Sequence, residues 1–407
     1  MINLWRYVGA SQVDHWRPQT SDGLLVRMDV APFLDAVPRF RHVAVTSVFG
    51  DPRSARTWSG APANVAAALE RRGVKIDAIA PTIGRGTKLR VALADFLAGR
   101  GRPVSTEQVL RSLGARQHFA RQVAWQARRL GVEHVLHTGT LDLPAIDATD
   151  GTKHYVYCDH TWALAQRHHV HVRRYTDRAM QAFEETERSA FRSLAHVFTF
   201  GAYVRDNIID HYGLPPERVT AVGSGMGAIR PFDGPKDFAQ PKLLFVAKHL
   251  FHAKGGALLL EAFKLAQKLR GDLSLTIVGD ERSRRFVAPT RGVVFHAHLP
   301  WAELQRLYRD CTLLVQPMLN DPWGQVYLEA MVSRTPVMGL ARNGLPELTD
   351  GGRHGFLVDR ADPEALSDAI VSAVSDPERL ETMAAAAQRY ALATHSWDRV
   401  AERMLFS

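Results

Sequence analysis

The chain has 407 residues, of which 46% are hydrophobic and 23% charged, and a formal net charge of +9 at pH 7. This length exceeds one ordinary hydrophobic core, so we expect two domains. No segment reaches the roughly 18 to 20 apolar residues of a membrane span, and Arg6, Asp14 and Arg17 interrupt the apolar run that a signal peptide needs. We therefore expect a cytoplasmic protein without a disulfide between Cys158 and Cys311, and no zinc site.

In the first half, short apolar runs alternate with helical patterns, which is typical of parallel βα units. HVAVTSVFG (42–50) predicts a strand, and APANVAAALERRG (61–73) predicts a helix closed by a glycine. A long helix should end near Arg192. The other predicted strands are VKIDAIAP (74–81), HVLHTGT (134–140), KHYVYCD (153–159) and HVFTF (196–200).

The region 85–129 is strongly basic, with ten Lys and Arg residues against two acids. Its patterns KLRVALADFLAG (88–99) and VLRSLGARQHFARQVAWQARRL (109–130) predict helices. Three interpretations remain open: a solvated helical face, a surface that contacts an anionic membrane or a lipid phosphate, and a nucleic-acid surface. Because no nucleic-acid-binding motif accompanies the charge, we expect no nucleic-acid partner.

The second half repeats the strand and helix alternation. Predicted strands are KLLFVA (242–247), LSLTIVGD (273–280), VVFHA (293–297) and TLLVQPM (312–318). Between the halves, residues 226–242 hold three prolines and two glycines without periodicity, so this stretch predicts a linker. Just before it, GSGMGA (223–228) has the spacing G-x-G-x-G and no helical pattern after it, which argues against a dinucleotide fingerprint. Ligands of such sheets bind outside the carboxyl ends of the strands.

The stretch DPWGQVYLEAM (321–331) is where a buried strand should give way to a helix beginning near Gly324. Asp321 would then lie in the loop, with Glu329 about one and a half turns into the helix. The amides of Gln325, Val326 and Tyr327 would offer an anion site at the helix N-terminus. A nucleotide-sugar, with hydroxyls on both sides of a diphosphate, suits this arrangement. The alternative is that Asp321 only caps the helix and Glu329 is a solvated charge.

Two further turns offer anion sites. Lys248 and Lys254 flank the loop KHLFHAKGG before a helix starting near Gly256, as in a diphosphate clamp. WSGAPANV (58–65) places a small Ser-Gly pair, with Gly60, at the first strand-to-helix turn, where a phosphate or an acceptor could approach.

These motifs resemble glycosyltransferase family 4, whose members are retaining, nucleotide-sugar-dependent enzymes of GT-B fold. The likeness is carried by DPWGQVYLEAMVSRTPVMG, LLFVAKHLFHAKGGALLLEAF with LTIVGD, ARNGLPELTDGGRHGFLVDRADPEALSDAI, VFTFGAYVRDNIIDHYGLPPERVTAVGSGM and THSWDRVAERML. It implies an α/β fold of two Rossmann-like parallel-sheet domains facing across a cleft. The implied bounds are 1–228 for the acceptor-side domain, 229–389 for the donor-binding domain and 390–407 for a helix that crosses back.

By this resemblance Glu329 would bind the ribose and Asp321 the transferred sugar. Lys248 and Lys254, helped by the amides of residues 325–327, would hold the diphosphate as charge builds on it. Because no Asp-x-Asp occurs, we expect no metal and no cofactor. Base recognition is expected by backbone around His298 and Pro300.

On the acceptor side, YVYCDHTW (155–162) supplies Asp159 and His160, and the sequence leaves open which of them faces the cleft. His137 is interpreted as structural. The chain departs from the family pattern at Asp321, where Glu is usual, at Ala247-Lys248, where Gly-Arg is usual, and at Ala297, where Gly is common. Replacing Arg by Lys keeps the charge but loses the bidentate fork.

The function expected from the sequence is transfer of a hexose from a UDP- or GDP-linked donor to a glycan or lipid-linked acceptor. Two alternatives are a non-catalytic GT-B subunit that binds a partner or glycan and a sugar-nucleotide epimerase. Contact with the inner face of the membrane through the basic region 85–129 is a further expectation.

Overall fold

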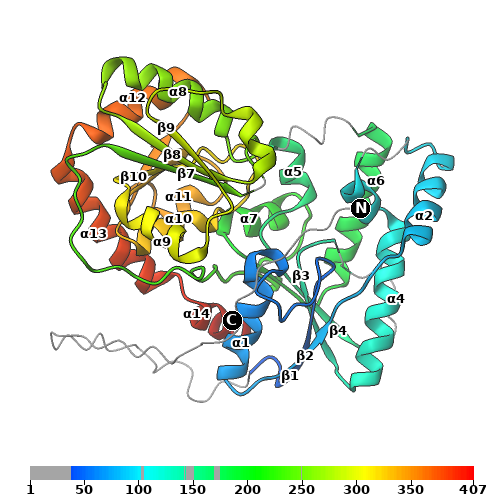
Figure 1. The fold of residues 1–407 in the computed structure, drawn as a ribbon. Coiled ribbons are helices and arrows are strands. Elements are labelled where there is room, and N and C mark those ends of the chain that lie inside the picture. Colours follow the sequence, from blue (N-terminus) through cyan, green and yellow to red (C-terminus); the bar gives the residue numbers. More distant parts are fainter. Residues whose placement is uncertain (1–37, 102–104, 142, 144–150, 169–174, 249) are drawn as a thin grey trace. The chain divides into compact units, whose positions relative to one another are not determined.

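The computed structural model describes residues 38–101, 105–141, 143, 151–168, 175–248 and 250–407 (Figure 1). These residues form two six-stranded sheets in which every strand pairs in parallel. The first sheet holds β1 (His42–Thr46), β2 (Lys75–Ile79), β3 (His134–Thr138), β4 (Lys153–Cys158), β5 (His196–Thr199) and β6 (Val219–Ala221). The second holds β7 (Lys242–Lys248), β8 (Ser274–Gly279), β9 (Val293–Ala297), β10 (Leu313–Val315), β11 (Val337–Leu340) and β12 (Phe356–Val358). The predicted α/β class with two parallel sheets is confirmed.

Strand order creates one reversal point in each sheet. The orders are β2-β1-β3-β4-β5-β6 and β12-β11-β10-β7-β8-β9. The first strand of each sheet, β1 or β7, therefore has the next strand along the chain on one side and a later strand on the other. Loops leaving the carboxyl ends of β1 and β3, or of β7 and β10, run to opposite faces of their sheet, which leaves a crevice between them. Ligand-binding residues are expected at these two places.

Helices connect the strands on both faces of the sheets. In the first half these are α1 (Ala61–Arg71), α2 (Arg85–Leu97), α3 (Thr106–Arg111), α4 (Leu113–Leu130), α5 (Trp162–His168), α6 (Asp177–Ser193) and α7 (Ala202–Asp210). In the second half they are α8 (Gly256–Leu269), α9 (Trp301–Asp310), α10 (Gln325–Val332), α11 (Leu345–Leu348), α12 (Pro363–Val374), α13 (Pro377–Thr394) and α14 (Trp397–Phe406). None of the helices that these residues form is long and apolar enough to cross a membrane.

The single helical pattern over residues 109–130 is divided in the structure. Ser112 is extended, with φ −64° and ψ 150°, and its side chain accepts a hydrogen bond from the Ala115 amide, so it caps a new helix, α4. The apolar pattern continued across the break because Val109 of α3 and Ala115 and Phe119 of α4 belong to one buried cluster. β6, β11 and β12, of three or four residues each, were not predicted. β10 is equally short but was predicted, because it lies within the longer apolar run TLLVQPM.

The C-terminal helix α14 packs on α1 in the first half (Figure 1). Its buried face consists of Val400, Ala401, Met404 and Leu405. At its edge Arg71 donates to Asp398 over 2.8 Å. Since α13 immediately precedes α14 and packs on α10, one continuous C-terminal segment binds both halves.

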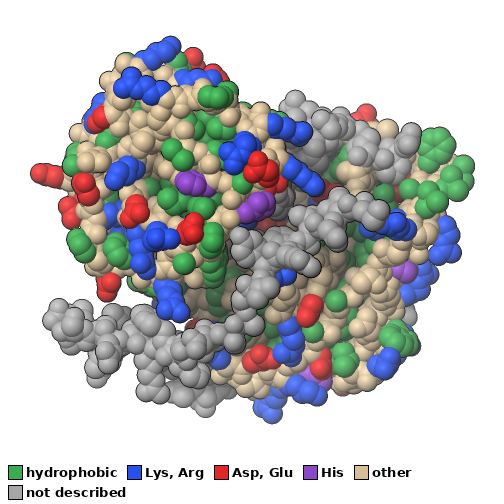
Figure 2. Space-filling model, viewed as in Figure 1, with side chains coloured by type: hydrophobic (Ala, Val, Ile, Leu, Met, Phe, Trp, Pro, Cys, Tyr) green, Lys and Arg blue, Asp and Glu red, His purple; other side chains and the backbone are tan. Residues whose placement is uncertain are grey.

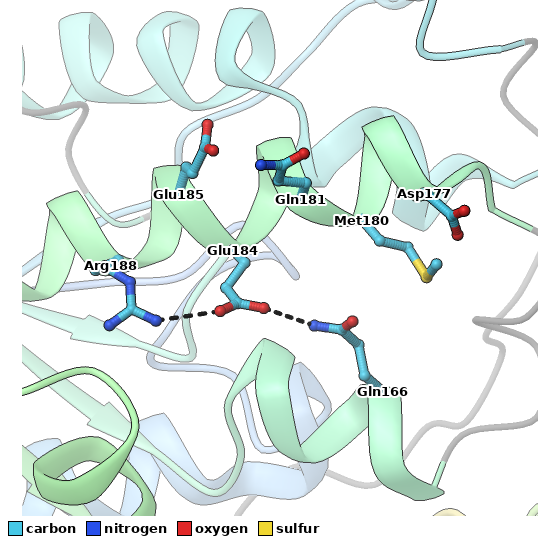
Figure 3. Close-up of a pocket in the computed structure, with 7 residues that line it drawn as sticks. All are labelled: Gln166, Asp177, Met180, Gln181, Glu184, Glu185 and Arg188. Atoms are coloured by element: carbon cyan, nitrogen blue, oxygen red, sulfur yellow. Dashed lines mark hydrogen bonds and ion pairs between the residues drawn. The ribbon is translucent and has the colours of Figure 1, made fainter.

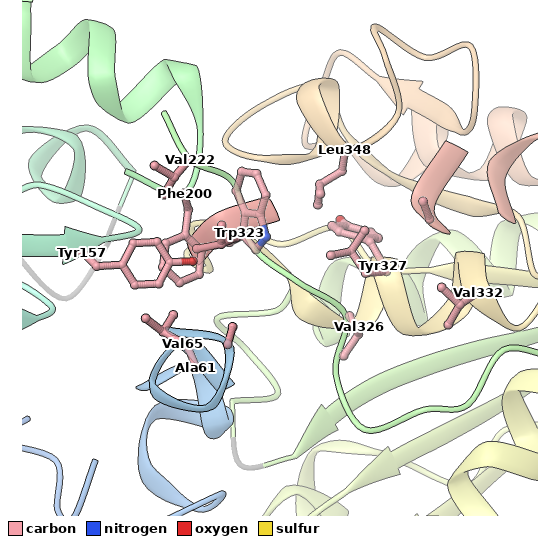
Figure 4. Packing of buried hydrophobic residues seen from close by; sticks show 14 of the residues in the cluster. Ala61, Val65, Tyr157, Phe200, Val222, Trp323, Val326, Tyr327, Val332 and Leu348 are labelled. Atoms are coloured by element: carbon pink, nitrogen blue, oxygen red, sulfur yellow. The ribbon is translucent and has the colours of Figure 1, made fainter. Parts of the chain in front are cut away.

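Apolar packing is also continuous between the halves. Figure 4 shows Tyr157, Phe200 and Val222 from the first half beside Trp323 from the second. The Phe200 and Trp323 rings meet edge to face, with centroids 5.8 Å apart. A contact of this kind contributes about 0.5–1.5 kcal/mol beyond area burial.

Replacing Met404 by Ala should lower the free energy of unfolding by about 2–5 kcal/mol, because the fully buried side chain leaves a cavity between α14 and α1. Chemical denaturation with Leu392→Ala as control would check this, since Leu392 is 38% exposed on α13. A loss of unfolding free energy in Met404→Ala as small as that expected for the exposed Leu392→Ala would show that α14 contributes little to stability.

Candidate active site

A buried ion pair lies at the β7/β10 reversal point. Lys254 Nζ lies 2.9 Å from Asp321 Oδ2, and only 9% and 18% of the two side chains are exposed. The loops that carry them are joined by backbone hydrogen bonds from Met318 to Lys254 and from Asn320 to Ala253, of 2.9 and 2.8 Å. Sequence reasoning placed both residues here but did not foresee that they pair.

Asp321 is held in its ionised form. Burial alone would raise its pKa, but the charge and hydrogen bond of Lys254, with the backbone amides of Trp323 and Gly324, lower the pKa overall. These amides precede the helix, and Gly324 at the N-cap position of α10 has no side-chain capping bond. The alternative that Asp321 simply caps the helix is therefore not what the structure shows.

Gly324 allows the sharp entry into α10. Its φ of 84° is left-handed, and an added Cβ would lie 2.7 Å from the Tyr327 ring. The Tyr327 amide donates to the Gly324 carbonyl over 2.9 Å. The tight turn therefore already uses the Tyr327 amide, and an anion site at this helix N-terminus stays a prediction that would rest on the amides of Gln325 and Val326.

Glu329 is buried rather than solvated, with 4% exposure. Its Oε2 accepts a hydrogen bond of 2.8 Å from the Tyr308 hydroxyl of α9. Burial and then the Glu329 charge raise the pKa of Tyr308, which keeps this hydroxyl a donor. On the other side, a Cβ on Gly227 would lie 2.5 Å from Oε1. A carboxylate buried against one hydroxyl and a glycine backbone is not an incidental surface charge.

The segment GSGMGA (223–228) lies against this turn. Trp323 Nε1 donates to Ser224 Oγ over 2.6 Å, and Gln325 Nε2 donates to the Gly225 carbonyl over 2.6 Å. Trp397 of α14 donates to the Met226 carbonyl over 2.8 Å. The glycines permit this close approach of backbone to side chains. The close spacing of glycines in this segment indicated a place where backbone and side chains pack tightly. In the sequence it was tested only against a dinucleotide-binding fingerprint.

A second group of hydrogen bonds joins the halves near Asp321. Glu347 accepts hydrogen bonds of 2.7 Å each from the Ala202 and Tyr203 amides at the start of α7. The Tyr203 hydroxyl donates to the carbonyls of Asp159 and Pro322, over 2.9 and 2.7 Å. No sequence signal identified these partners, because each bond joins residues more than forty positions apart.

A cavity of about 340 Å³ lies at the β1/β3 reversal point. It is lined by Phe49 and Trp58 after β1, by Gly139, Thr140 and Leu141 after β3, by Asp159, His160 and Thr161 after β4, and by Glu107, Leu110 and Arg111 of α3. Both Asp159 and His160 therefore line it. The second half influences Asp159: burial, followed by the Asp321 charge, raises its pKa to about 7.

The turn that carries Gly60 is strained. Trp58, Ser59 and Gly60 are consecutive left-handed residues, with φ of 44°, 55° and 84°. The Trp58 ring lies 5.3 Å from that of Phe200 and also lines the cavity. Sequence reasoning selected the Ser-Gly pair here and missed the tryptophan, whose position against the cavity follows from the unusual backbone.

The remaining residues considered in the sequence differ in burial: Lys248 and His298 are exposed, whereas His137 and the two cysteines are buried. Lys248 is exposed at the end of β7, after a ladder irregularity, with φ 50°. His298 is exposed just after the edge strand β9, and its amide donates to the Gly279 carbonyl over 3.2 Å. His137 is fully buried and bonds the His154 ring over 2.9 Å, which supports its structural interpretation. Cys158 and Cys311 are buried free thiols.

A separate hollow of about 420 Å³ lies between α5 and α6 (Figure 3). Glu184 at its centre is bonded to Arg188 and Gln166. Burial opposes ionisation of Glu184, but hydrogen bonds from Gln166, His211 and Arg188 lower its pKa overall. The hollow contains no residue predicted to bind a donor or acceptor, and its central charge is already neutralised.

Two known families match consecutive parts of the chain. "Glycosyltransferase Family 4" matches residues 63–226, and "Glycosyl transferases group 1" matches residues 232–390. The chain belongs to glycosyltransferase family 4. The two matches meet between β6 and β7, where the chain passes from the first sheet to the second.

Relatives agree with this family 4 assignment, and a solved structure shares the fold. The D-inositol 3-phosphate glycosyltransferase of Streptomyces avermitilis is 26% identical over 80% of this chain and 75% of its own. D-inositol 3-phosphate glycosyltransferase 1 of Catenulispora acidiphila is 29% identical over 49% of this chain. The chain spans about half the length of that relative, 53%. Sucrose-phosphate synthase of Thermosynechococcus elongatus has a TM-score of 0.68 at 16% identity, covering 89% of this chain and 97% of its own, which shows the shared GT-B fold.

Replacing Gly227 by Ala should displace Glu329, since the new Cβ would press on its carboxylate from 2.5 Å. We expect the thermal shift produced by a bound nucleoside diphosphate to shrink, while the fold itself persists. Gly271→Ala is the matched control, because nothing lies within 4 Å of its added Cβ. An undiminished nucleotide shift in Gly227→Ala would separate Glu329 from nucleotide binding.

The raised pKa of Asp159 predicts a pH dependence of stability. Between the ordinary value of 3.8 and about 7 the folded protein holds a proton that the unfolded chain releases, so the free energy of unfolding should fall as pH rises through this window. Urea denaturation across that window should show Asp159→Asn gaining stability relative to the parent as pH rises. Asp233→Asn, at an exposed position, is the control. Parallel curves of unfolding free energy against pH for the parent and Asp159→Asn would contradict the prediction.

Proposed function

We propose that the protein transfers a hexose from a nucleoside-diphosphate sugar to a hydroxyl of a glycan or lipid-linked acceptor, with retention and without a metal. The observation that carries the proposal is the turn into α10. There Asp321 with buried Lys254, two helix amides and buried Glu329 follow one another along the carboxyl edge of the sheet. This order matches sugar, diphosphate and ribose.

In the proposed donor complex Glu329 accepts hydrogen bonds from the ribose hydroxyls. Its Oε2 is fixed by Tyr308, so the carboxylate is oriented before the ligand arrives. Lys254 and the exposed Lys248 face the diphosphate, with the Gln325 and Val326 amides. Positive groups fixed in place stabilise the charge that develops on a leaving diphosphate, and a buried lysine does so more strongly than a solvated one. His298 and Pro300 lie at the rim proposed for the base.

In the proposed reaction the bond between the sugar anomeric carbon and the diphosphate oxygen breaks, and the acceptor oxygen bonds to the same face of that carbon. The acceptor proton passes to the departing diphosphate oxygen. Asp321, kept ionised by Lys254, accepts hydrogen bonds from the sugar hydroxyls and stabilises the positive charge that develops on the sugar ring. Asp159, with a pKa of about 7, provides a hydrogen-bonding group that alternates between donor and acceptor near neutral pH.

The cavity after β1, β3 and β4 is the proposed acceptor site. Phe49, 51% exposed, and Trp58 offer aromatic surface of the kind on which sugar rings pack. The cation among the described lining residues, Arg111, is paired with Glu107 at 2.8 Å. The site therefore supports a neutral, hydroxyl-rich acceptor group better than a phosphate.

A thermal-shift series with UDP, GDP, ADP and dTDP, in the presence of a chelator, tests donor binding directly. At 100 times its dissociation constant, one nucleotide should stabilise the protein by about 2.7 kcal/mol. Glu329→Ala should abolish the shift and turnover, whereas Glu281→Ala, with 65% of its side chain exposed, should change neither.

Four flat traces at millimolar nucleotide would favour a non-catalytic binding subunit. A nucleotide shift together with Glu329→Ala turnover equal to that of the parent would reject the site assignment. Release of an epimerised nucleotide-sugar without any acceptor would favour the epimerase alternative.

A further inference from the structure

Helix α2 turns an apolar face to the outside. Four large side chains on it are more than half exposed: Leu89 by 71%, Leu93 by 55%, Phe96 by 56% and Leu97 by 76%. Its inward face buries only Val91 and Asp95. A surface helix normally shows the opposite arrangement, with apolar residues toward the core.

The exposed apolar residues form one stripe. Advancing about 100° per residue, positions 89, 93, 96 and 97 fall within an arc of about 100°. Arg85 lies just beyond one edge of this arc and Arg90 just beyond the other, and both are exposed. The apolar stripe of α2 (Leu89, Leu93, Phe96 and Leu97) is therefore bordered by a cation on each side.

The charge around the stripe is positive and unbalanced. The two acids of region 85–129 form ion pairs within the region: Asp95 with Arg100 and Glu107 with Arg111, both at 2.8 Å. Among the described residues, no carboxylate pairs with the following six cations: Arg85, Lys88, Arg90, Arg121, Arg128 and Arg129.

Figure 2 shows hydrophobic side chains gathered over α2 at the right-hand edge of the molecule, with Lys and Arg side chains below them over α4. Helices α2 and α4 pack on each other. On α4, Trp125 is 57% exposed and the Arg129 guanidinium lies 4.6 Å from its ring centroid. Large apolar side chains interspersed with cations extend in this way from α2 to its neighbour.

We propose that the apolar stripe of α2 docks this protein on an anionic lipid bilayer. The helix would lie in the plane of the interface, with the four apolar side chains in the acyl boundary and Arg85 and Arg90 at the lipid phosphates. Charge complementarity favours this occupant, because six cations without acidic partners, five of them exposed and Lys88 half-buried, suit a uniformly negative surface. The sequence left a solvated face as an alternative, and exposed Leu and Phe at these positions do not fit it.

Docking would bring the acceptor cavity to the membrane. Helix α3 is the next helix after α2, and its Glu107, Leu110 and Arg111 form one wall of that cavity. This step rests on the proposed function: if the cavity binds the acceptor, the acceptor hydroxyl belongs to a lipid-linked glycan or glycolipid headgroup. Docking itself does not depend on that step.

The test is co-sedimentation of the full chain with vesicles of phosphatidylcholine alone or with about 30% phosphatidylglycerol. We expect binding to the anionic vesicles that weakens as salt is raised. The double variant Leu93→Asp/Phe96→Asp should lower the partition coefficient by at least about tenfold. Arg85→Glu/Arg90→Glu should remove the preference for anionic lipid. Leu269→Asp is the matched control, because Leu269 is 65% exposed on α8 of the other half.

All these side chains are on the surface, so the variants should fold, and an unchanged melting temperature and nucleotide shift would verify it. Failure of nucleotide binding in every variant and the parent would concern the proposed function alone. Absence of vesicle binding by the parent, or equal binding by parent and Leu93→Asp/Phe96→Asp, would overturn the docking proposal. Concentration-dependent self-association that this double variant abolishes, without vesicle binding, would instead assign the stripe to a second copy of the chain.

Discussion

The ion pair between Lys254 and Asp321 organises the second half of the site. Two opposite charges that are more than four-fifths withdrawn from water are stable only if their remaining hydrogen-bonding capacity is met. Here the amides of Trp323 and Gly324 complete the shell of the carboxylate, and two backbone bonds tie the loops together. The loops after β7 and β10 are thereby fixed relative to each other at the point where the sheet order reverses.

The same turn also holds the first half. Trp323, two residues after Asp321, packs on Phe200 and bonds Ser224, while Glu347 occupies the amides at the start of α7. Burial raises the pKa of Asp159, and the charge of Asp321 raises it further. A change at Asp321 would therefore alter the protonation of a residue in the acceptor cavity, so the two substrate sites proposed here share one electrostatic environment.

The first half differs from the second in what it presents to solvent. Around α10 the polar groups are buried and mutually satisfied, whereas on α2 large apolar groups are exposed beside unpaired cations. The first arrangement suits a small, charged donor that must be oriented. The second suits an extended surface that needs no precise contacts, because lipid headgroups are mobile and interchangeable.

Local sequence pattern was sufficient for much of the fold. Long apolar runs and helical periodicity predicted nine of the strands and the starts of α8 and α10, since these depend on neighbouring residues. The capping serine at position 112 was hidden by the longer helical pattern around it, and β6, β11 and β12 lack the longer apolar run that made the equally short β10 predictable.

For the site, local pattern was enough to place Asp321, Lys254, Asp159 and His160 in the loops that follow strands, and Glu329 in the helix after Asp321. The state of these side chains depends on contacts between distant segments. Glu329 is buried because α9 supplies Tyr308 and the segment before β7 supplies Gly227. The pKa of Asp159 is raised first by burial and then by the charge of Asp321 from the other half. Likewise, the helical pattern of α2 was visible in the sequence, but its exposed face was not. Periodicity records which residues share a face, whereas the packing of distant segments decides whether that face is covered.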